Sequence, residues 1–236
     1  EANVTEQLLL SGALRAEDYS DFGENVSGKV AARYDFNDSI AIRGSVQTGF
    51  RAPSLQQQFF TSTATNNVNG TLIEVGTFPS TSPVGLALGG VALDAETSTN
   101  FALGAVFRFD GGSMTIDAYR INVDDRITLS ENITGAAAVA ALQAQGIFNA
   151  SSGRYFLNGV DTETTGVDMV LTFGLKTADM GDFDFTFGAN LNETKVTRSP
   201  EPFVTGTTSF VRFGRVASLT FEEGTPKDKF SANVAW

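Results

Sequence analysis

Residues 44–60 read GSVQTGFRAPSLQQQFF, an alternating stretch that ends in an Arg-Ala-Pro step. Successive side chains of an extended chain lie on opposite faces, so Val46 belongs to an apolar face and Gln47 and Arg51 belong to a polar one. Pro53 has no N–H to donate to a neighbouring strand, and it restricts the residue before it. The stretch therefore predicts a β-strand with two different faces that stops pairing at the proline.

The same alternation recurs along the chain and predicts about eight strands. They cover residues 8–17, 26–36, 40–50, 101–109, 114–123, 167–175, 183–191 and 230–236. Within residues 114–123 the apolar positions change phase, which predicts a β-bulge near Ala118 and Tyr119.

The connections between these strands alternate in length. Tight turns are predicted at Asn37-Asp38, where both residue types tolerate positive φ, and at residues 110–112 and 178–182. Long links rich in Ser, Thr, Asn and Gly cover residues 52–95, 130–156 and 198–226. A soluble β-sandwich explains the alternation equally well, but structureless links of this length are uncommon in such a domain. An outer-membrane barrel is expected to have short periplasmic turns and long extracellular loops.

The predicted strand length also fits a membrane. Residues 26–36 extend roughly 34 Å and span about 24 Å at a tilt of about 45°, close to the apolar band of about 25 Å in outer-membrane barrels. Aromatic residues near the tight turns, such as Tyr34 and Phe109, lie where an interfacial girdle belongs. We therefore predict an all-β fold, an antiparallel meander of about eight long strands that forms a partial transmembrane β-barrel. Short periplasmic turns, long extracellular loops and a short loop helix near 135–145, ended by Gly146, complete the prediction.

The composition excludes most enzyme classes. The chain has no cysteine and no histidine, which removes Ser-His-Asp and Cys-His arrangements, disulfides and the commonest zinc ligand. Its 16 Lys and Arg against 27 Asp and Glu give a net charge of -11, which argues against a nucleic-acid surface. Loop carboxylates such as Asp161, Glu163 and Asp168 match no known calcium-binding spacing. We predict no enzyme activity, no catalytic residue, no metal site, no cofactor and no nucleic-acid partner.

Four stretches resemble the barrel of TonB-dependent outer-membrane receptors. They are GFRAPSLQQQFF (49–60), ETSTNFALGAVFRFDGGSMTIDAYRINVDDRI (96–127), NGVDTETTGVDMVLTF (158–173) and TPKDKFSANVAW (225–236). Their order is that of the family, and the resemblance covers nearly the whole chain.

The resemblance implies that residues 1–236 are a single fragment of a larger barrel. Family members carry an N-terminal plug domain and roughly 22 strands. The plug, the first strands and the last strands are therefore expected to lie outside this chain. The implied setting is the outer membrane of a Gram-negative bacterium, and the implied function is part of an active-transport receptor for a scarce nutrient. Ferric siderophores, cobalamin, haem and oligosaccharides are all open as substrates. The alternatives are a soluble secreted all-β binding or adhesion module and a passive porin-like channel.

The implied partners follow from the same family. They are outer-membrane lipid, the plug domain of the same parent chain, an inner-membrane energy-coupling protein acting through the N-terminal part, and an unidentified small-molecule substrate. The isolated fragment is expected to associate with itself, because it would have open strand edges and an apolar outer face without lipid.

Five residues are candidates for contact with the substrate or the lumen. Arg43, Gln47 and Arg51 are predicted to face the lumen, either in a structural hydrogen-bond network that contacts the plug or in contact with an anionic or polar substrate. We favour the structural role. Phe59 and Phe60, like Phe78 in the same link and Phe203 in another, either grip a substrate at the mouth or pack the loops together, and the sequence does not separate these two roles.

Overall fold

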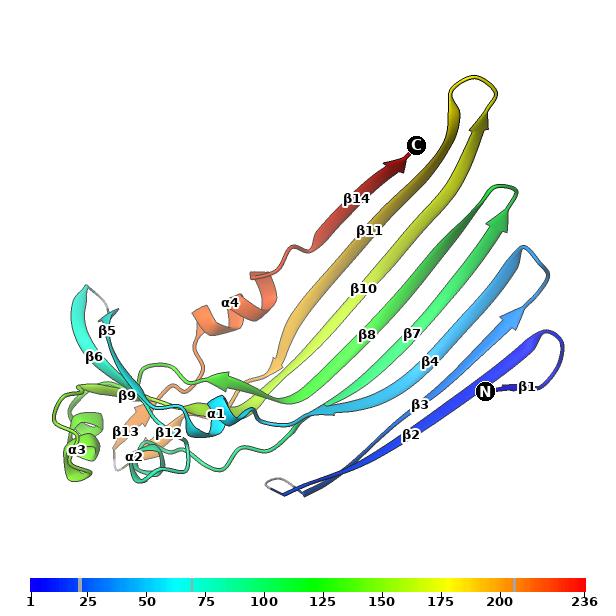
Figure 1. Cartoon of the computed structure of the whole chain (residues 1–236). Coiled ribbons are helices and arrows are strands. Elements are labelled where there is room, and N and C mark those ends of the chain that lie inside the picture. The colour runs from blue at the N-terminus through cyan, green and yellow to red at the C-terminus, as the bar shows by residue number, and fades with distance from the viewer. Residues whose placement is uncertain (21–22, 69, 206) are drawn as a thin grey trace.

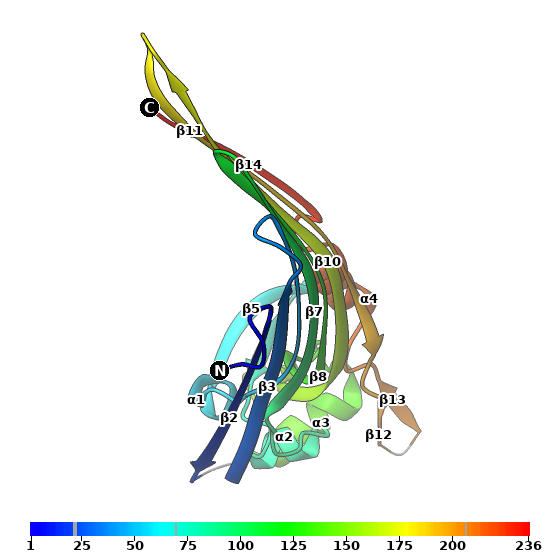
Figure 2. The same cartoon turned by 90° about the vertical axis from the view of Figure 1, so that its right-hand side faces the viewer.

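A single large antiparallel sheet carries most of the chain in a computed structural model that describes residues 1–20, 23–68, 70–205 and 207–236 (Figure 1). Its strands, in spatial order, are β1 (Ala2–Asn3), β2 (Leu8–Tyr19), β3 (Gly23–Asp35), β4 (Ile40–Arg51), β7 (Glu96–Phe109), β8 (Gly112–Leu129), β10 (Phe156–Thr177), β11 (Gly181–Arg198) and β14 (Asp228–Ala235). Neighbours in the sheet follow one another along the chain, so the predicted meander of eight long strands is confirmed, with the short β1 added at one edge. Figure 2 shows the sheet as a curved wall with the connections gathered at one end.

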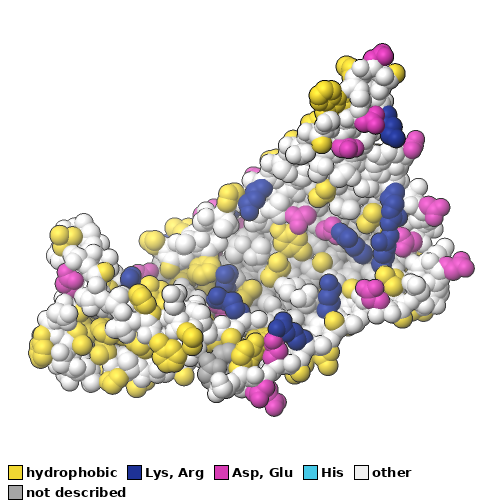
Figure 3. All heavy atoms as spheres, viewed as in Figure 1, with side chains coloured by type: hydrophobic (Ala, Val, Ile, Leu, Met, Phe, Trp, Pro, Cys, Tyr) yellow, Lys and Arg dark blue, Asp and Glu magenta, His cyan; other side chains and the backbone are white. Residues whose placement is uncertain are grey.

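The strand register separates the sheet into an apolar and a polar face. One lateral row of register partners is apolar throughout: Tyr34, Ile42, Ala105, Ile116, Met169, Ala189 and Phe230. The row one residue away is largely polar: Arg33, Arg43, Gly104, Asp117, Asp168, Asn190 and Lys229. Apolar side chains stay uncovered on the first face, such as Val30 at 69% and Leu103 at 66% exposure. This is the arrangement of a membrane barrel wall, with lipid outside and a polar lumen inside (Figure 3 looks onto the polar face).

Aromatic side chains gather on the outward face at the end of the sheet that carries the tight turns. Tyr34 meets Phe36 edge-on with ring centroids 4.9 Å apart, and Phe173 stacks on Phe185 at the same distance. Trp236 extends this stack through Phe183. An aromatic girdle of this kind marks the periplasmic membrane interface.

The tight turns lie where they were predicted, but the one after β3 forms for a different reason. Asn37 Oδ1 accepts hydrogen bonds from the N–H groups of Ser39 and Ile40, each at 2.9 Å. Positive φ plays no part at Asn37 or Asp38. The side-chain carbonyl of Asn37 therefore closes this turn, whereas the turns after β7 and β10 use Gly111 and Gly181 at positive φ.

The β-bulge predicted near Ala118 and Tyr119 is wrong. The pairing of β8 with both β7 and β10 runs through these residues without interruption. The register shift lies further on, where Asp125 adopts a φ of 54°. The sequence changes phase because β8 carries a charge at its next outward position: Arg120 pairs there with Glu163, while its register partner Phe101 on β7 is still apolar.

Three strands are much longer than predicted. β8, β10 and β11 contain 18, 22 and 18 residues, whereas about 9–11 residues are enough to cross a bilayer. Their outer halves contain polar runs such as residues 162–165, Thr-Glu-Thr-Thr, which carry no apolar alternation. The strands therefore continue beyond the membrane as an extracellular extension of the wall.

The long connections fold into short elements at the outer end of the sheet. They are α1 (Leu55–Phe59), β5 (Ser62–Val68), β6 (Thr71–Thr77), α2 (Pro83–Ala87), α3 (Ala136–Ala144), β9 (Ser152–Arg154), β12 (Phe203–Thr205), β13 (Thr208–Phe210) and α4 (Arg215–Glu223). The predicted loop helix is α3, and Gly146 at φ 78° ends it as expected. The N–H of Ile147 bonds to the carbonyl of Leu142 at 3.0 Å, which completes a Schellman motif. None of the described helices is long and apolar enough to span a membrane.

Candidate functional site

Arg43 lies on the polar face and is committed to an ion pair with the wall itself. Its Nε donates to Asp117 Oδ1 at 2.9 Å and its Nη2 to Asp117 Oδ2 at 2.6 Å. The intervening strand provides Gly104, where a Cβ would lie 2.0 Å from Asp117 Oδ1. The missing side chain lets this bidentate pair lie flat across three strands. Arg43 is thus paired within the wall, and its contact with the plug or with a substrate stays a prediction.

A second polar cluster continues the same row. Asn190 Nδ2 donates to Asp168 Oδ1 at 2.5 Å and to the Tyr119 hydroxyl at 3.1 Å, and Asn192 donates to Asn190 Oδ1 at 2.6 Å. Tyr119 lies over Gly166, where a Cβ would be 2.4 Å from its hydroxyl. None of the residues of this cluster is among the five sequence candidates. Its signal is Gly166, at a polar-face position of β10 beside Tyr119, just as Gly104 lies at a polar-face position of β7 beside Asp117.

Gln47 lies on the polar face, and its contact with the plug or with a substrate stays a prediction. Its register partners on the two neighbouring strands are Lys29 and Asn100, and its side chain is exposed. It therefore belongs to a polar surface that is open toward the lumen.

Arg51 ends β4 and joins two of the stretches that carry the family resemblance. It is the register partner of Glu96, the residue that opens ETSTN, and its Nε donates to Glu96 Oε2 at 2.9 Å. Glu96 is 6% exposed as a residue, and its carboxylate also accepts from the N–H of Ile127 at 2.7 Å. Two charged hydrogen bonds and one backbone bond therefore satisfy this buried carboxylate.

Arg126 is a second cation near Glu96, on the extracellular side of the register shift. Its Nη1 donates to Thr162 Oγ1 at 3.1 Å, and its guanidinium lies 4.6 Å from the ring centroid of Phe221 in α4. Burial lowers the pKa of Arg126, while the charge of Glu96 acts in the opposite direction. A half-buried cation thus fixes α4 against the wall through a cation–π contact.

Arg198 organises the register shift. Its Nε donates to Asp161 Oδ2 at 2.5 Å and its Nη2 to Asp125 Oδ1 at 2.6 Å, and Asp161 also accepts from the N–H of Asp125 at 2.8 Å. Burial alone would raise the pKa of Asp161, but the hydrogen bonds from Arg198 and Asp125 lower it below its ordinary value. The cluster therefore holds the left-handed conformation of Asp125 in place.

The carboxylates considered for calcium lie apart and have other partners. Asp161 pairs with Arg198, and Glu163 pairs with Arg120. Asp168 accepts from Asn190. Within the described ranges, no group of three acidic side chains could hold a metal ion.

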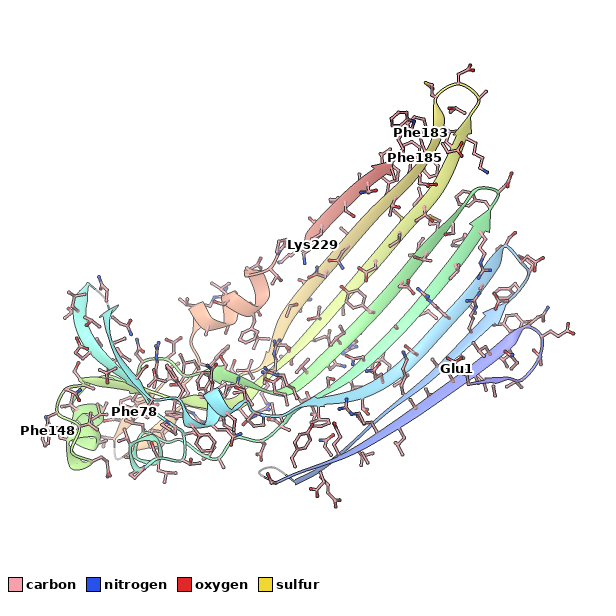
Figure 4. All side chains as sticks on the ribbon, viewed as in Figure 1. Glu1, Phe78, Phe148, Phe183, Phe185 and Lys229 are labelled. Atoms are coloured by element: carbon pink, nitrogen blue, oxygen red, sulfur yellow. The ribbon has the colours of Figure 1, made fainter. Side chains whose placement is uncertain are left out.

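The four loop aromatics divide into two pairs. Phe78 is 7% exposed within a hydrophobic core shared by the connections, and Phe203 packs on that core with its ring 6.3 Å from Phe210 (Figure 4 labels Phe78). Phe59 and Phe60 are 64% and 47% exposed, on and next to α1, a helix without buried residues. Figures 1 and 2 place α1 on the polar-face side of the sheet, at its outer end. One pair therefore packs the loops, and the other remains open at the mouth.

Comparison with known proteins identifies the class of this wall. A family model described as TonB dependent receptor-like, beta-barrel matches residues 1–236, so the chain belongs to the TonB-dependent receptor β-barrel family. The family resides in the Gram-negative outer membrane, and its members are transporters and not enzymes. This assignment excludes the soluble secreted module.

Individual relatives include siderophore receptors. The ferric enterobactin receptor PirA of Pseudomonas aeruginosa is 31% identical over 128 residues, which cover 54% of this chain and 16% of that protein. The solved structure of the siderophore receptor PirA from Pseudomonas aeruginosa has a TM-score of 0.61 at 20% identity, covering 83% of this chain and 33% of that one. PirA from Acinetobacter baumannii has a TM-score of 0.58 at 17% identity, covering 98% and 37%. At these identities the structural matches show the fold alone, and the chain spans about a third of each solved receptor.

Proposed function

We propose that the chain forms part of the barrel wall and extracellular mouth of a receptor that imports a ferric siderophore by energy-coupled transport. The observation that carries this proposal is the pair of adjacent register rows, one apolar toward lipid and one polar toward a lumen. Among siderophores, cobalamin, haem and oligosaccharides, the siderophore is supported by the name of the relative that is 31% identical.

The candidate residues take different roles in this proposal. Arg43 and Arg51 hold the wall together through Asp117 and Glu96. Gln47 contributes to the surface against which the plug domain of the parent chain docks. Phe59 and Phe60 contact the substrate at the mouth, since they are the two exposed residues among the four candidate loop aromatics. Residues 1–236 act as one piece of the barrel domain, and the inner-membrane energy-coupling protein acts through another part of the parent protein.

Transport by the full-length receptor tests the proposal. A strain that lacks the receptor gene should lose uptake of one iron-55-labelled siderophore under iron limitation, and the full-length gene should restore it. A protonophore should abolish the restored uptake. Uptake that persists with a protonophore would mean a passive pore, and a receptor that restores uptake of cobalamin or haem alone would refute the siderophore assignment.

The isolated chain of 236 residues should associate with itself in water. Every residue of the edge strand β14 is exposed, including Phe230 at 75%, and the outward apolar row has no cover. Such edges and faces drive strand pairing and apolar contact between copies. A monodisperse monomer in light scattering without detergent would contradict this expectation.

A further inference from the structure

We propose that the three extracellular connections form one fixed rim that does not open loop by loop when ligand binds. The rim body is defined as residues 71–95, 130–157 and 203–214 without residue 206. The proposal concerns how the mouth works, and its transport test rests on the proposed function.

All three connections share one hydrophobic core. The β4–β7 connection contributes Phe78, Val84 and Leu88; the β8–β10 connection contributes Ile133, Ala138, Leu142, Ala150, Tyr155 and Leu157; the β11–β14 connection contributes Phe210. Leu142 and Tyr155 are fully buried, and Leu88 is 2% exposed. Separation of any one connection would expose apolar side chains of the other two to water, which is unfavourable.

Backbone pairing joins the first two connections. β6 and β9 pair in parallel, with the register Val75–Ser152, Gly76–Gly153 and Thr77–Arg154. The ladder continues beyond both ends: the N–H of Phe78 donates to the carbonyl of Arg154 at 2.9 Å, and the N–H of Ser151 donates to that of Glu74 at 3.0 Å. Opening between these loops would break a continuous run of backbone hydrogen bonds.

Two glycines let side chains pack tightly on this strand pair. A Cβ at Gly76 would lie 2.3 Å from Cζ of Phe78, and one at Gly153 would lie 2.4 Å from Cδ1 of Leu88. The aromatic ring and the leucine therefore rest directly on the paired backbones. Packing this close is typical of a folded interior.

The third connection is hydrogen-bonded to the β8–β10 connection and packs against the β4–β7 connection. The N–H of Glu131 donates to the carbonyl of Arg212 at 3.0 Å, and Glu131 Oε1 accepts from the N–H of Gly214 at 3.2 Å. The ring of Phe203 covers Gly89, where a Cβ would lie 2.4 Å from the ring. Each pair of connections is thus in direct contact.

The rim body is also continuous with the wall. β8 and β10 pair as far as Leu129 and Phe156, and Leu157, the next residue of β10, belongs to the shared core. Asn158 Nδ2 donates to the carbonyls of Asp94 at 2.9 Å and Asp125 at 2.7 Å, which ties the β4–β7 connection to the junction of β8 and β10. In contrast, α1 buries no residue. Movement at this part of the mouth is therefore assigned to the α1 segment and not to the rim body.

A disulfide across the β6–β9 pair tests the proposal in the full-length receptor. The chain contains no cysteine, so Val75→Cys with Ser152→Cys would introduce its only disulfide between register partners. We expect siderophore uptake to be equal in oxidised and reduced cells, with Ser152→Cys alone as the control. Uptake that is lost at least tenfold on oxidation and restored by a reductant would overturn the proposal. A receptor inactive in both states, with the unsubstituted receptor also inactive, would instead refute the proposed function.

Hydrogen exchange tests the rim without ligand or transport. Leu142→Ala removes a core side chain from the β8–β10 connection, whereas Phe148→Ala, at a residue 77% exposed in the same connection, is the matched control (Figure 4). We expect Leu142→Ala to speed amide exchange in β6 and β13 as well as in α3, with β7 and β8 unchanged, and Phe148→Ala to change none of them. Faster exchange confined to residues 130–157 would show independent loops and overturn the proposal.

Discussion

Leu103 in the wall and Leu142 in the rim body are leucines of one chain in opposite environments. Leu103 is 66% exposed on the outward face, with no protein side chain to cover it, and Leu142 is completely buried. The wall keeps its apolar residues outside for lipid and its charges inside, whereas the rim body buries apolar residues as an aqueous domain does. The location of apolar side chains thus reverses at the level where β8, β10 and β11 leave the membrane. They lie on the outer surface within the membrane and in a buried core beyond it.

Truncation of the rim core should have the largest effect, confined to the rim. We expect Leu88→Ala to lower the free energy of unfolding of the rim body by about 2–5 kcal/mol, because it leaves a cavity in a packed core. Leu86→Ala, at a position 56% exposed in the same segment, should cost little. Limited proteolysis within residues 130–157 measures the difference, and equal protease sensitivity of the two variants would contradict the shared core.

A charge on the lipid face should destabilise the wall and spare the rim. Leu103→Arg lies near the middle of the apolar band and should cost about 2–4 kcal/mol in unfolding of the full-length receptor from lipid vesicles. Ala102→Arg is the matched control, because Ala102 belongs to the polar face. If both variants unfold at the same urea concentration, the assignment of the two faces is wrong.

The junction between the two regions depends on one buried carboxylate. Glu96→Gln weakens the bonds from Arg51 and should cost about 1–3 kcal/mol. Glu163→Gln removes a pair in which Arg120 is 57% exposed, so it should cost less than about 1 kcal/mol. Chemical denaturation of the two variants in parallel provides the comparison, and a larger loss for Glu163→Gln would show that the Glu96 contact is not structural.

A pH-dependent change at the register shift should be the smallest effect. The folded-state pKa of Asp161 is lowered, so its contribution to stability is present above its ordinary value of 3.8 and lost as the pH falls through the folded pKa. Amide exchange at Asp125, corrected for its intrinsic pH dependence, should therefore accelerate in strong acid. Asp161→Asn should show fast exchange at every pH, and an unchanged rate in this variant would exclude the role of Asp161.

The wall was largely predictable from the sequence, because apolar and polar residues that alternate along a strand indicate which face of the sheet each side chain occupies. That signal disappears above the membrane, where residues 162–165 are polar on both faces, and the strand ends were therefore placed too early. The phase change near Ala118 was mistaken for a bulge for the same reason. The family resemblance predicted the class but not the geometry.

The rim body could not be predicted, because its contacts join residues far apart in the chain. Val75 pairs with Ser152, and Phe210 packs with Leu88 in one cluster. Residue types alone predicted both roles for the four loop aromatics, and only the fold separates Phe78 and Phe203 from Phe59 and Phe60. The partners of Arg43 and Arg51 were equally hidden, although glycine at position 104 gave a local hint of a side chain lying across it.

The Arg51–Glu96 contact has a consequence for how receptors of this kind diversify. It fixes the register of β4 against β7 at the point where residues 52–95 leave and rejoin the wall. An insertion or deletion between these two residues leaves the strand alignment unchanged, since the alignment is set by the ends of the segment and not by its length. Natural variation can therefore exchange the outer segment, and with it the surface presented to the environment, while the barrel that carries it stays the same.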